Sequence, residues 1–261
     1  MPEFSCQPII DASTGRIAAV ELLSRLPLKY GDEHAMLAVD LDAVSCAARM
    51  ARSSDMPVHA NVEWSSILLG GEVLLASVRP GVVIELTERR PAGKAGNAER
   101  AHVLDFLGRA RMNGAAIALD DMEDAPDADL LIERFRPDIV KVRDMATISM
   151  VCHMADRIVA EHIETYVDLD AARHRGADLL QGWLIDQLAS LRQRASLRWS
   201  LSGTADPAGR AASPAEEGRE QIARLLRKNL VVSSTVQPQN SCYGAARQCA
   251  SMSSTRATCS G

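Results

Sequence analysis

Short apolar runs typical of β-strands alternate with helix-like stretches along the chain up to about residue 190. We expect strands over Cys6–Ile10, Ile17–Leu22, Val58–Val62, Val82–Leu86, Ala115–Leu119, Asp138–Val142, Ile158–Ile163 and Leu179–Leu184. Helical patterns fall between them, among others over Ala35–Arg52, Ala98–Asn113, Asp127–Phe135 and Val167–Arg175. Repeated strand–helix–strand order is typical of parallel strands joined by crossover helices, so the sequence predicts an α/β fold with a parallel sheet.

Polar side chains stand at or near the C-terminal ends of seven successive predicted strands. They are Glu21, Asn61, Glu85, the pair Asp120 and Asp121, Lys141, Glu161 and Gln181. In a (β/α)8 barrel of the TIM type these strand ends converge on one face, where the active site is built. One carboxylate at a strand end is usually a solvated loop residue or a helix cap, but seven polar ends in succession favour a shared site.

Five acidic side chains brought together at one face would repel each other and be partly protonated. Bound divalent cations would remove this conflict, and ligation by oxygen atoms alone suits Mg²⁺ or Mn²⁺ better than zinc. In the adjacent pair, Asp120 could bridge two ions while Asp121 reaches only one, as in a two-metal site for phosphodiester hydrolysis.

The charge balance excludes several classes of protein. The chain has 29 basic and 34 acidic residues, a net charge of −5, and seven of the basic residues lie from Leu201 onward. An acidic body lacks the electrostatic footprint of a DNA- or RNA-binding protein. No apolar run is long enough to span a membrane and no signal sequence opens the chain, so we expect a cytoplasmic location and reduced thiols for the six cysteines.

Composition divides the chain into a barrel over residues 1–200 and a tail over residues 201–261. Ser202–Glu217 and Ser233–Gly261 are rich in small and polar residues, which predicts disorder. Ile222–Leu230 between them has the pattern of one basic amphipathic helix. This helix is interpreted either as a loosely docked C-terminal helix or as a contact with a partner or a membrane surface.

The motifs at the strand ends resemble those of the EAL-domain family, the bacterial cyclic di-GMP phosphodiesterase module. The resemblance starts in QPIIDASTGRIAAVELLSR, continues through HANVE, VVIELTER, IALDD, DIVKVRD, IVAEHIET and ADLLQGW, and covers about Gln7 to Leu188. It implies an EAL-type barrel in which one strand is antiparallel to the others. It also implies hydrolysis of cyclic di-GMP to linear pGpG.

The resemblance also implies a two-metal ligand set. The first metal would be held by Glu21, Asn61, Glu85 and Asp120, and the second by the shared Asp120 together with Asp121 and Glu161.

Five further residues match family positions around that metal site. Lys141 would lie beside the attacking water, and Gln181 would fix the water network or a neighbouring ligand. Arg25 matches an arginine that grips a substrate phosphate, and Gln7 matches a substrate-contacting glutamine. Glu88 matches the glutamate that steadies the loop after Asp121.

The sequence departs from the family pattern in two ways. In the loop after the paired aspartates, Glu123 and Ala125 replace two glycines and three acids would face an anionic substrate. In the family this loop positions the second metal and contributes to the dimer face, so the change bears on turnover and on a homodimer. The connection Met145–Arg157 is also short for a parallel crossover, which predicts a shortened or irregular barrel on that side.

These observations leave three alternatives open for the function. The chain is a metal-dependent cyclic di-GMP phosphodiesterase, or a non-catalytic regulator that binds the nucleotide or a protein partner, or a decaying gene product. His59, two positions before Asn61, is interpreted as a core or solvated histidine more readily than as a residue of the same cavity.

Overall fold

The computed structural model describes residues 4–25, 32–54, 56–87, 96–120 and 136–190. Eight strands close into a barrel in sequence order. They are β1 (Phe4–Asp11), β2 (Ile17–Ser24), β3 (Val58–Glu63), β4 (Val82–Thr87), β5 (Ala116–Leu119), β6 (Ile139–Val142), β7 (Arg157–Ala160) and β8 (Leu179–Leu180). β1 is antiparallel to β2 and β8, and the other neighbours are parallel. This confirms the predicted barrel with one antiparallel strand.

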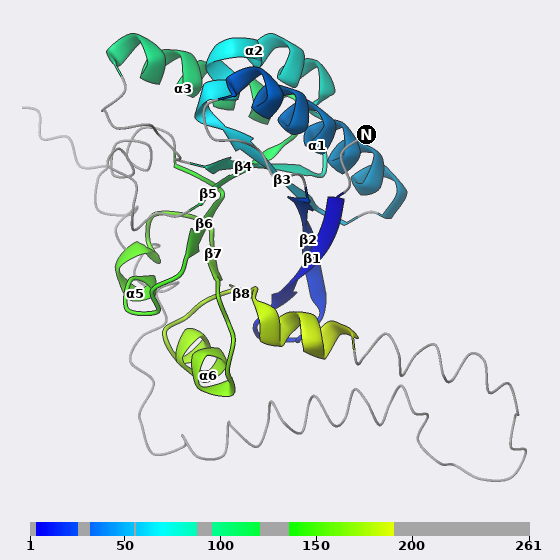
Figure 1. Cartoon of the computed structure of the whole chain (residues 1–261). Helices are drawn as coiled ribbons and strands as arrows, with labels where there is room; N and C mark the ends of the chain where they lie inside the picture. The colour runs from blue at the N-terminus through cyan, green and yellow to red at the C-terminus, as the bar shows by residue number, and fades with distance from the viewer. Residues whose placement is uncertain (1–3, 26–31, 55, 88–95, 121–135, 191–261) are drawn as a thin grey trace, which may run out of the picture.

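Helices lie outside the ring of strands (Figure 1). On one side are α1 (Glu33–Ser54), α2 (Trp64–Ser77) and α3 (Asn97–Met112), and on the other are α5 (Ile148–Val151) and α6 (Tyr166–His174). The predictions for α1, α3 and α6 are confirmed within two residues at each end. α2 was not among the predicted helices, since its apolar sequence WSSILLGGEVLLAS lacks a clear polar face.

The crossover between β6 and β7 is as short as the sequence predicted. Its described helix, α5, is a single turn of four residues, whereas α1 has 22. Val151 and Ile148 of α5 are buried and belong to the apolar cluster that covers β6 and β7. Among the described residues, a single turn therefore packs on β6 and β7 on this side of the barrel.

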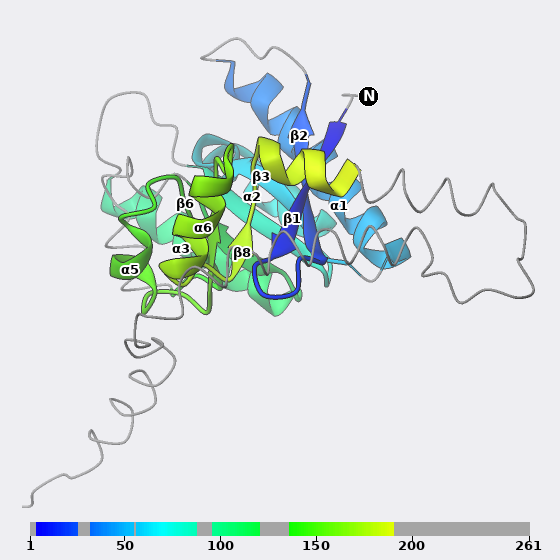
Figure 2. The same ribbon diagram turned by 90° about the horizontal axis from the view of Figure 1, so that it is seen from below.

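The predicted strands over Ile158–Ile163 and Leu179–Leu184 were too long at their C-terminal ends. His162 has φ of 53° and Gly182 has φ of 147°, and neither backbone can continue a strand. A Cβ atom on Gly182 would lie 2.3 Å from the backbone nitrogen of Ile163, so these two segments pass each other closely. Residues 183–190 form a helix at this end of the barrel (Figure 2).

The barrel interior below the polar strand ends is filled by an apolar layer. Because side chains alternate along a strand, the residue two positions below each polar strand end points into the same interior. Seven such residues form one buried cluster, here named the floor layer: Ile9, Ala19, Val83, Ala118, Ile139, Val159 and Leu179. The floor layer supports the polar side chains above it at the mouth of the barrel.

In the described part of the chain, no helix combines the length and the apolar character needed to cross a membrane. The predicted helix over Asp127–Phe135 and the predicted tail over residues 201–261 lie outside the described residues.

Candidate metal centre

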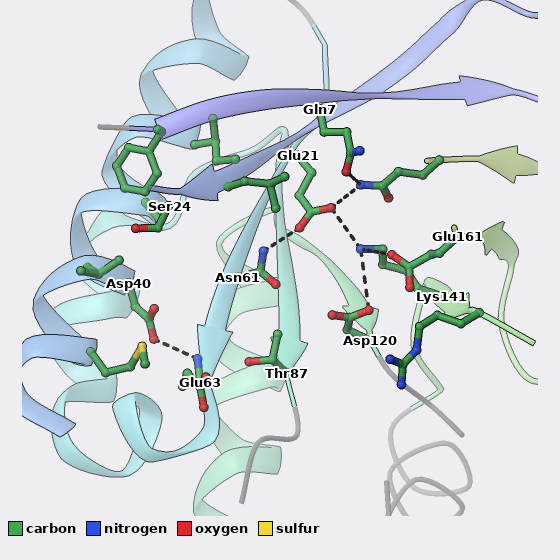
Figure 3. Close-up of a pocket in the computed structure, with 18 of the residues that line it drawn as sticks. Gln7, Glu21, Ser24, Asp40, Asn61, Glu63, Thr87, Asp120, Lys141 and Glu161 are labelled. Carbon is green, nitrogen blue, oxygen red and sulfur yellow. Dashed lines mark hydrogen bonds and ion pairs between the residues drawn. The ribbon is translucent and has the colours of Figure 1, made fainter. Parts of the chain in front are cut away.

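A pocket of about 810 Å³ opens at the C-terminal ends of the parallel strands. Seven of the predicted site residues line it, namely Gln7, Glu21, Asn61, Asp120, Lys141, Glu161 and Gln181. The first six are labelled in Figure 3. Gln7 reaches this end because β1 is antiparallel and pairs Gln7 directly with Glu21. Glu85 is fully buried and lies beneath the pocket surface.

The ammonium group of Lys141 lies among four carboxylates. Its Nζ is 2.8 Å from Glu161 Oε1, 3.2 Å from Glu21 Oε2 and 3.7 Å from Asp120 Oδ1. It also forms an ion pair with Oε1 of Glu85. The side chain of Lys141 is only 2% exposed, so these contacts are shielded from water. Four strands thus deliver acids to a single buried cation.

One ammonium does not neutralise four carboxylates, and both burial and the neighbouring charges shift the pKa values of these groups. Burial raises the pKa of Glu85 well above its usual value, although Lys141 opposes the rise. Burial also raises the pKa of Glu161 to about 8, again against the attraction of Lys141. Burial would raise the pKa of Glu21 too, but Lys141 and its hydrogen-bond donors hold that pKa below the usual value. The same acids raise the pKa of Lys141 despite its burial, so it stays charged.

Amide side chains orient Glu21 from both sides. Asn61 Nδ2 donates to Glu21 Oε1 over 2.7 Å, and Gln181 Nε2 donates to Glu21 Oε2. Gln181 Nε2 also donates to Gln7 Oε1 over 2.9 Å, and Gln7 Nε2 donates to Asp186 Oδ2 over 3.0 Å. This chain of hydrogen bonds joins β3, β2, β8 and β1 to the helix over residues 183–190, and it fixes the carboxylate of Glu21.

The donor atoms fit a divalent cation. Carboxylate oxygens of Glu21, Glu85 and Glu161 all lie within 4.8 Å of one another. Asp120 Oδ1 is buried and has no hydrogen-bond partner among the described residues; its one described ion-pair contact, with Lys141 Nζ, is 3.7 Å long and leaves the oxygen able to accept a ligand. A set of carboxylate and amide oxygens suits Mg²⁺, Mn²⁺ or Ca²⁺. The site therefore offers the oxygen atoms and the excess negative charge that such an ion requires.

Three predicted site residues are not placed at this centre. Asp121 and Glu88 lie outside the described residues. Arg25 follows the end of β2 and is exposed, and the described pocket lining includes its neighbour Ser24 but not Arg25. The substrate-binding role of Arg25 therefore stays a prediction.

Asp186, the partner of Gln7, and Asp40 in the pocket wall were not among the predicted site residues. His59 is a core histidine, one of the two interpretations preferred from the sequence: it is 1% exposed and does not line the pocket. Its contact with Glu85 through Nδ1, over 3.1 Å, was not predicted. Burial, followed by the charge of Lys141, lowers the pKa of His59 to about 3, so the ring is neutral. The two-residue alternation on β3 was the available signal for His59, since it shares a face with Asn61.

Asp40 on α1 is a buried carboxyl group whose raised pKa can be tested separately from the four acids around Lys141. Its Oδ2 accepts a hydrogen bond from the backbone N–H of Glu63 over 2.9 Å, and the residue is only 4% exposed. Burial raises the pKa of Asp40 to about 6. Because the folded pKa exceeds the unfolded one, this carboxyl group stabilises the fold at low pH, and that contribution is lost as the pH rises through 6.

We therefore expect Asp40→Asn to be more stable than the unchanged protein above pH 6, by up to about 3 kcal/mol. The amide keeps a carbonyl acceptor for Glu63 but cannot ionise. Urea unfolding of both metal-free proteins at about pH 4, 6 and 8 measures the difference, which should shrink toward zero at the lowest pH. A difference that does not change with pH would show that ionisation of Asp40 is not the cause.

No protein-family model matches the sequence, and no curated protein matches it. Solved structures do match the fold. An EAL-domain protein from Listeria monocytogenes has a TM-score of 0.59 at 18% identity, over 74% of this chain and 92% of that one. The EAL domain of DcpA from Mycobacterium smegmatis has a TM-score of 0.55 at 19% identity, over 71% of this chain and 92% of that one.

BlrP1 from Klebsiella pneumoniae, solved as a complex with manganese and cyclic di-GMP, has a TM-score of 0.57 at 24% identity. The match covers 70% of this chain and only 55% of the BlrP1 chain, so this chain corresponds to about half of that protein. Identities this low establish the fold and not the chemistry. The chain has the fold of the EAL-domain structures, an eight-stranded β/α barrel in which the first strand is antiparallel to its neighbours.

Proposed function

We propose that the chain is a divergent member of the EAL-domain family that hydrolyses cyclic di-GMP to linear pGpG with two divalent cations, Mg²⁺ or Mn²⁺. One observation carries the proposal. Carboxylates from β2, β4, β7 and the end of β5, with Asn61 from β3, converge at the mouth of one barrel, around an 810 Å³ pocket. The structural neighbour BlrP1 was solved with manganese and cyclic di-GMP, which supports this choice of cofactor and substrate.

The proposed ligands divide into two sets that share one residue. The first ion would be held by Glu21, Asn61, Glu85 and Asp120, and the second by Asp120, Asp121 and Glu161. Two observations support a metal centre at this place: the Glu21, Glu85 and Glu161 carboxylates lie close together, and the buried Oδ1 of Asp120 has no hydrogen-bond partner among the described residues. Asp121 follows Asp120 directly in the chain, so the second set depends on a residue that only the sequence assigns.

When bound, such a pair of ions lowers the pKa of a water molecule and neutralises charge that develops on a phosphate. The residues of this chain would supply the positive charge and the hydrogen bonds that position the substrate and the metal ligands. Lys141 places a fixed positive charge beside the acids, where a phosphate oxygen would gain negative charge. Gln181 and Gln7 hold Glu21 and the β1 side of the pocket in place. Arg25 can give two parallel hydrogen bonds to a phosphate, which a lysine cannot.

A second candidate function is a non-catalytic regulator that binds cyclic di-GMP or a protein partner. The sequence of residues 122–127 favours it, because Glu123 and Ala125 stand where the family has glycines. Residues with a Cβ adopt positive φ at a cost, and the added acids repel an anionic substrate. A homodimer likewise stays a prediction.

Incubation of the purified protein with cyclic di-GMP and Mn²⁺ or Mg²⁺ separates these functions, with pGpG measured by chromatography and nucleotide binding measured in parallel. Turnover that disappears in Glu21→Ala supports the enzyme. The matched control is Glu72→Ala, which removes an exposed glutamate on α2 that pairs with Arg109. Binding without turnover supports the regulator, and the absence of both contradicts the proposed function.

A further inference from the structure

His59 occupies a position in the barrel interior that is apolar on every other strand. The floor layer takes one residue from each of the seven other strands, and all seven are Ile, Ala, Val or Leu. β3 contributes His59 at the same level, because His59 lies two residues below Asn61. A buried polar side chain in an apolar layer costs free energy unless it makes a compensating hydrogen bond. This cost indicates that His59 has a role other than packing.

The hydrogen bond of His59 is made to a candidate metal ligand. Its Nδ1 is 3.1 Å from Oε2 of Glu85, and both side chains are almost completely buried. The other oxygen of Glu85, Oε1, pairs with Lys141 in the acid cluster. His59 thus contacts Oε2 of Glu85, while Oε1 is directed toward Lys141 and the other acids.

β3 supplies a hydrogen-bonding side chain to each of its two neighbouring strands. Asn61 donates to Glu21 on β2, and His59 contacts Glu85 on β4. The parallel register explains this arrangement, since Asn61 is paired with Glu85 and His59 with Glu21 along the ladders, which places both side chains between the two acids. The strand between the first two acidic ligands therefore carries two neutral side chains that can orient both of them.

We propose that His59 is a positioning residue, which holds Glu85 in the orientation that binds the divalent cation by donating its Nδ1–H to Oε2. This inference rests on the proposed function, because it assigns Glu85 as a metal ligand. A carboxylate that binds a metal ion is ionised and can only accept a hydrogen bond, so Nδ1 must carry the hydrogen. Nε2 is then a bare acceptor, and it has no hydrogen-bond partner among the described residues.

Two variants separate the donor from the bulk of the ring. His59→Leu keeps a similar volume without a donor, and His59→Asn keeps an N–H close to the position of Nδ1. Outer hydrogen-bond partners of metal ligands typically contribute about 10–100-fold to metal affinity. We expect His59→Leu to raise the dissociation constant for Mn²⁺ by about this factor, and His59→Asn to stay close to the unchanged protein. Electron paramagnetic resonance of free Mn²⁺ measures the constant without any dependence on turnover.

The change in melting temperature on addition of Mn²⁺ distinguishes positioning from a purely structural role. A structural histidine would lower the melting temperature of the metal-free protein and leave the increase caused by Mn²⁺ unchanged. A positioning residue reduces that increase in His59→Leu, because weaker binding stabilises the fold less. Equal Mn²⁺ affinity in His59→Leu, or equal losses in both variants, would overturn the proposal.

A measurement on the unchanged protein covers the case in which His59→Leu does not fold. Nitrogen-15 spectra of histidine-labelled protein with Mg²⁺ report which ring nitrogen of His59 carries the hydrogen. Hydrogen on Nδ1 supports the assignment, and hydrogen on Nε2 overturns it. If the unchanged protein and Glu21→Ala both fail to bind Mn²⁺, the proposed function itself fails. If only the His59 results are negative, the proposed function stands and this inference alone is wrong.

Discussion

Replacing Lys141 by methionine is expected to lower the free energy of unfolding of the metal-free protein by about 3–5 kcal/mol, the usual result of removing one partner of a buried ion pair. The ammonium contacts four carboxylates in a setting that is 2% exposed, and methionine leaves them without a counter-ion. The acids would then bind protons or separate. For a domain of this size the melting temperature should fall by roughly 10 °C.

Mn²⁺ should act in the opposite direction on the same variant. Without the ammonium the centre is more negative by one charge, so a divalent cation gains more from binding there. We expect the increase in melting temperature caused by Mn²⁺ to be larger in Lys141→Met than in the unchanged protein, while any turnover falls because the charge beside the substrate is lost.

Calorimetry with EDTA and with excess Mn²⁺ measures both effects. Arg143→Met is the matched control, because Arg143 lines the same pocket but is only half-buried. A metal-free stability of Lys141→Met within 1 kcal/mol of the unchanged protein would mean that the acids do not depend on the ammonium. An unchanged response to Mn²⁺ would mean that the cation does not bind near Lys141.

Asp120→Asn is expected to reduce turnover by roughly 10³-fold or more, beyond the 10–100-fold typical of a residue that only supports a metal ligand. Asp120 is the residue proposed to bind both cations, and its buried Oδ1 has no hydrogen-bond partner among the described residues. An amide offers one oxygen without charge, so both ions would bind more weakly. Turnover of cyclic di-GMP and the dissociation constant for Mn²⁺ should change together.

The same substitution should stabilise the metal-free protein slightly, since it removes one of the four acids around Lys141. The expected change in the free energy of unfolding is therefore opposite in sign to that of Lys141→Met. A general loss of packing would lower the stability of both variants and could not produce this pair of results. Asp156→Asn, at an exposed aspartate outside the pocket, is the matched control. Retained Mn²⁺ affinity in Asp120→Asn would remove the basis for a shared ligand.

Much of the fold could be predicted because it is encoded locally. Each of the eight strands was predicted in its place, since a short apolar run is typical of a strand that is buried on both faces. The largest errors lie at the C-terminal ends of β7 and β8, where His162 and Gly182 turn the backbone. Nothing in the local sequence marks His162 as a residue with positive φ, because that conformation depends on the close passage of Ile163 and Gly182.

For the candidate site, too, one part could be predicted from the sequence and another part depends on the tertiary structure. The sequence alone determined which strand-end residues reach the mouth of the barrel, because the polar residue that ends each strand is a local pattern. Only the tertiary structure decided what these residues contact. Divalent ions were expected to supply the neutralising charge, yet Lys141 lies among the acids, in contact with Glu21 from 120 positions away in the chain. Such contacts depend on strand register and barrel closure, so the role of Lys141 and the hydrogen bond from His59 to Glu85 are properties of the closed barrel.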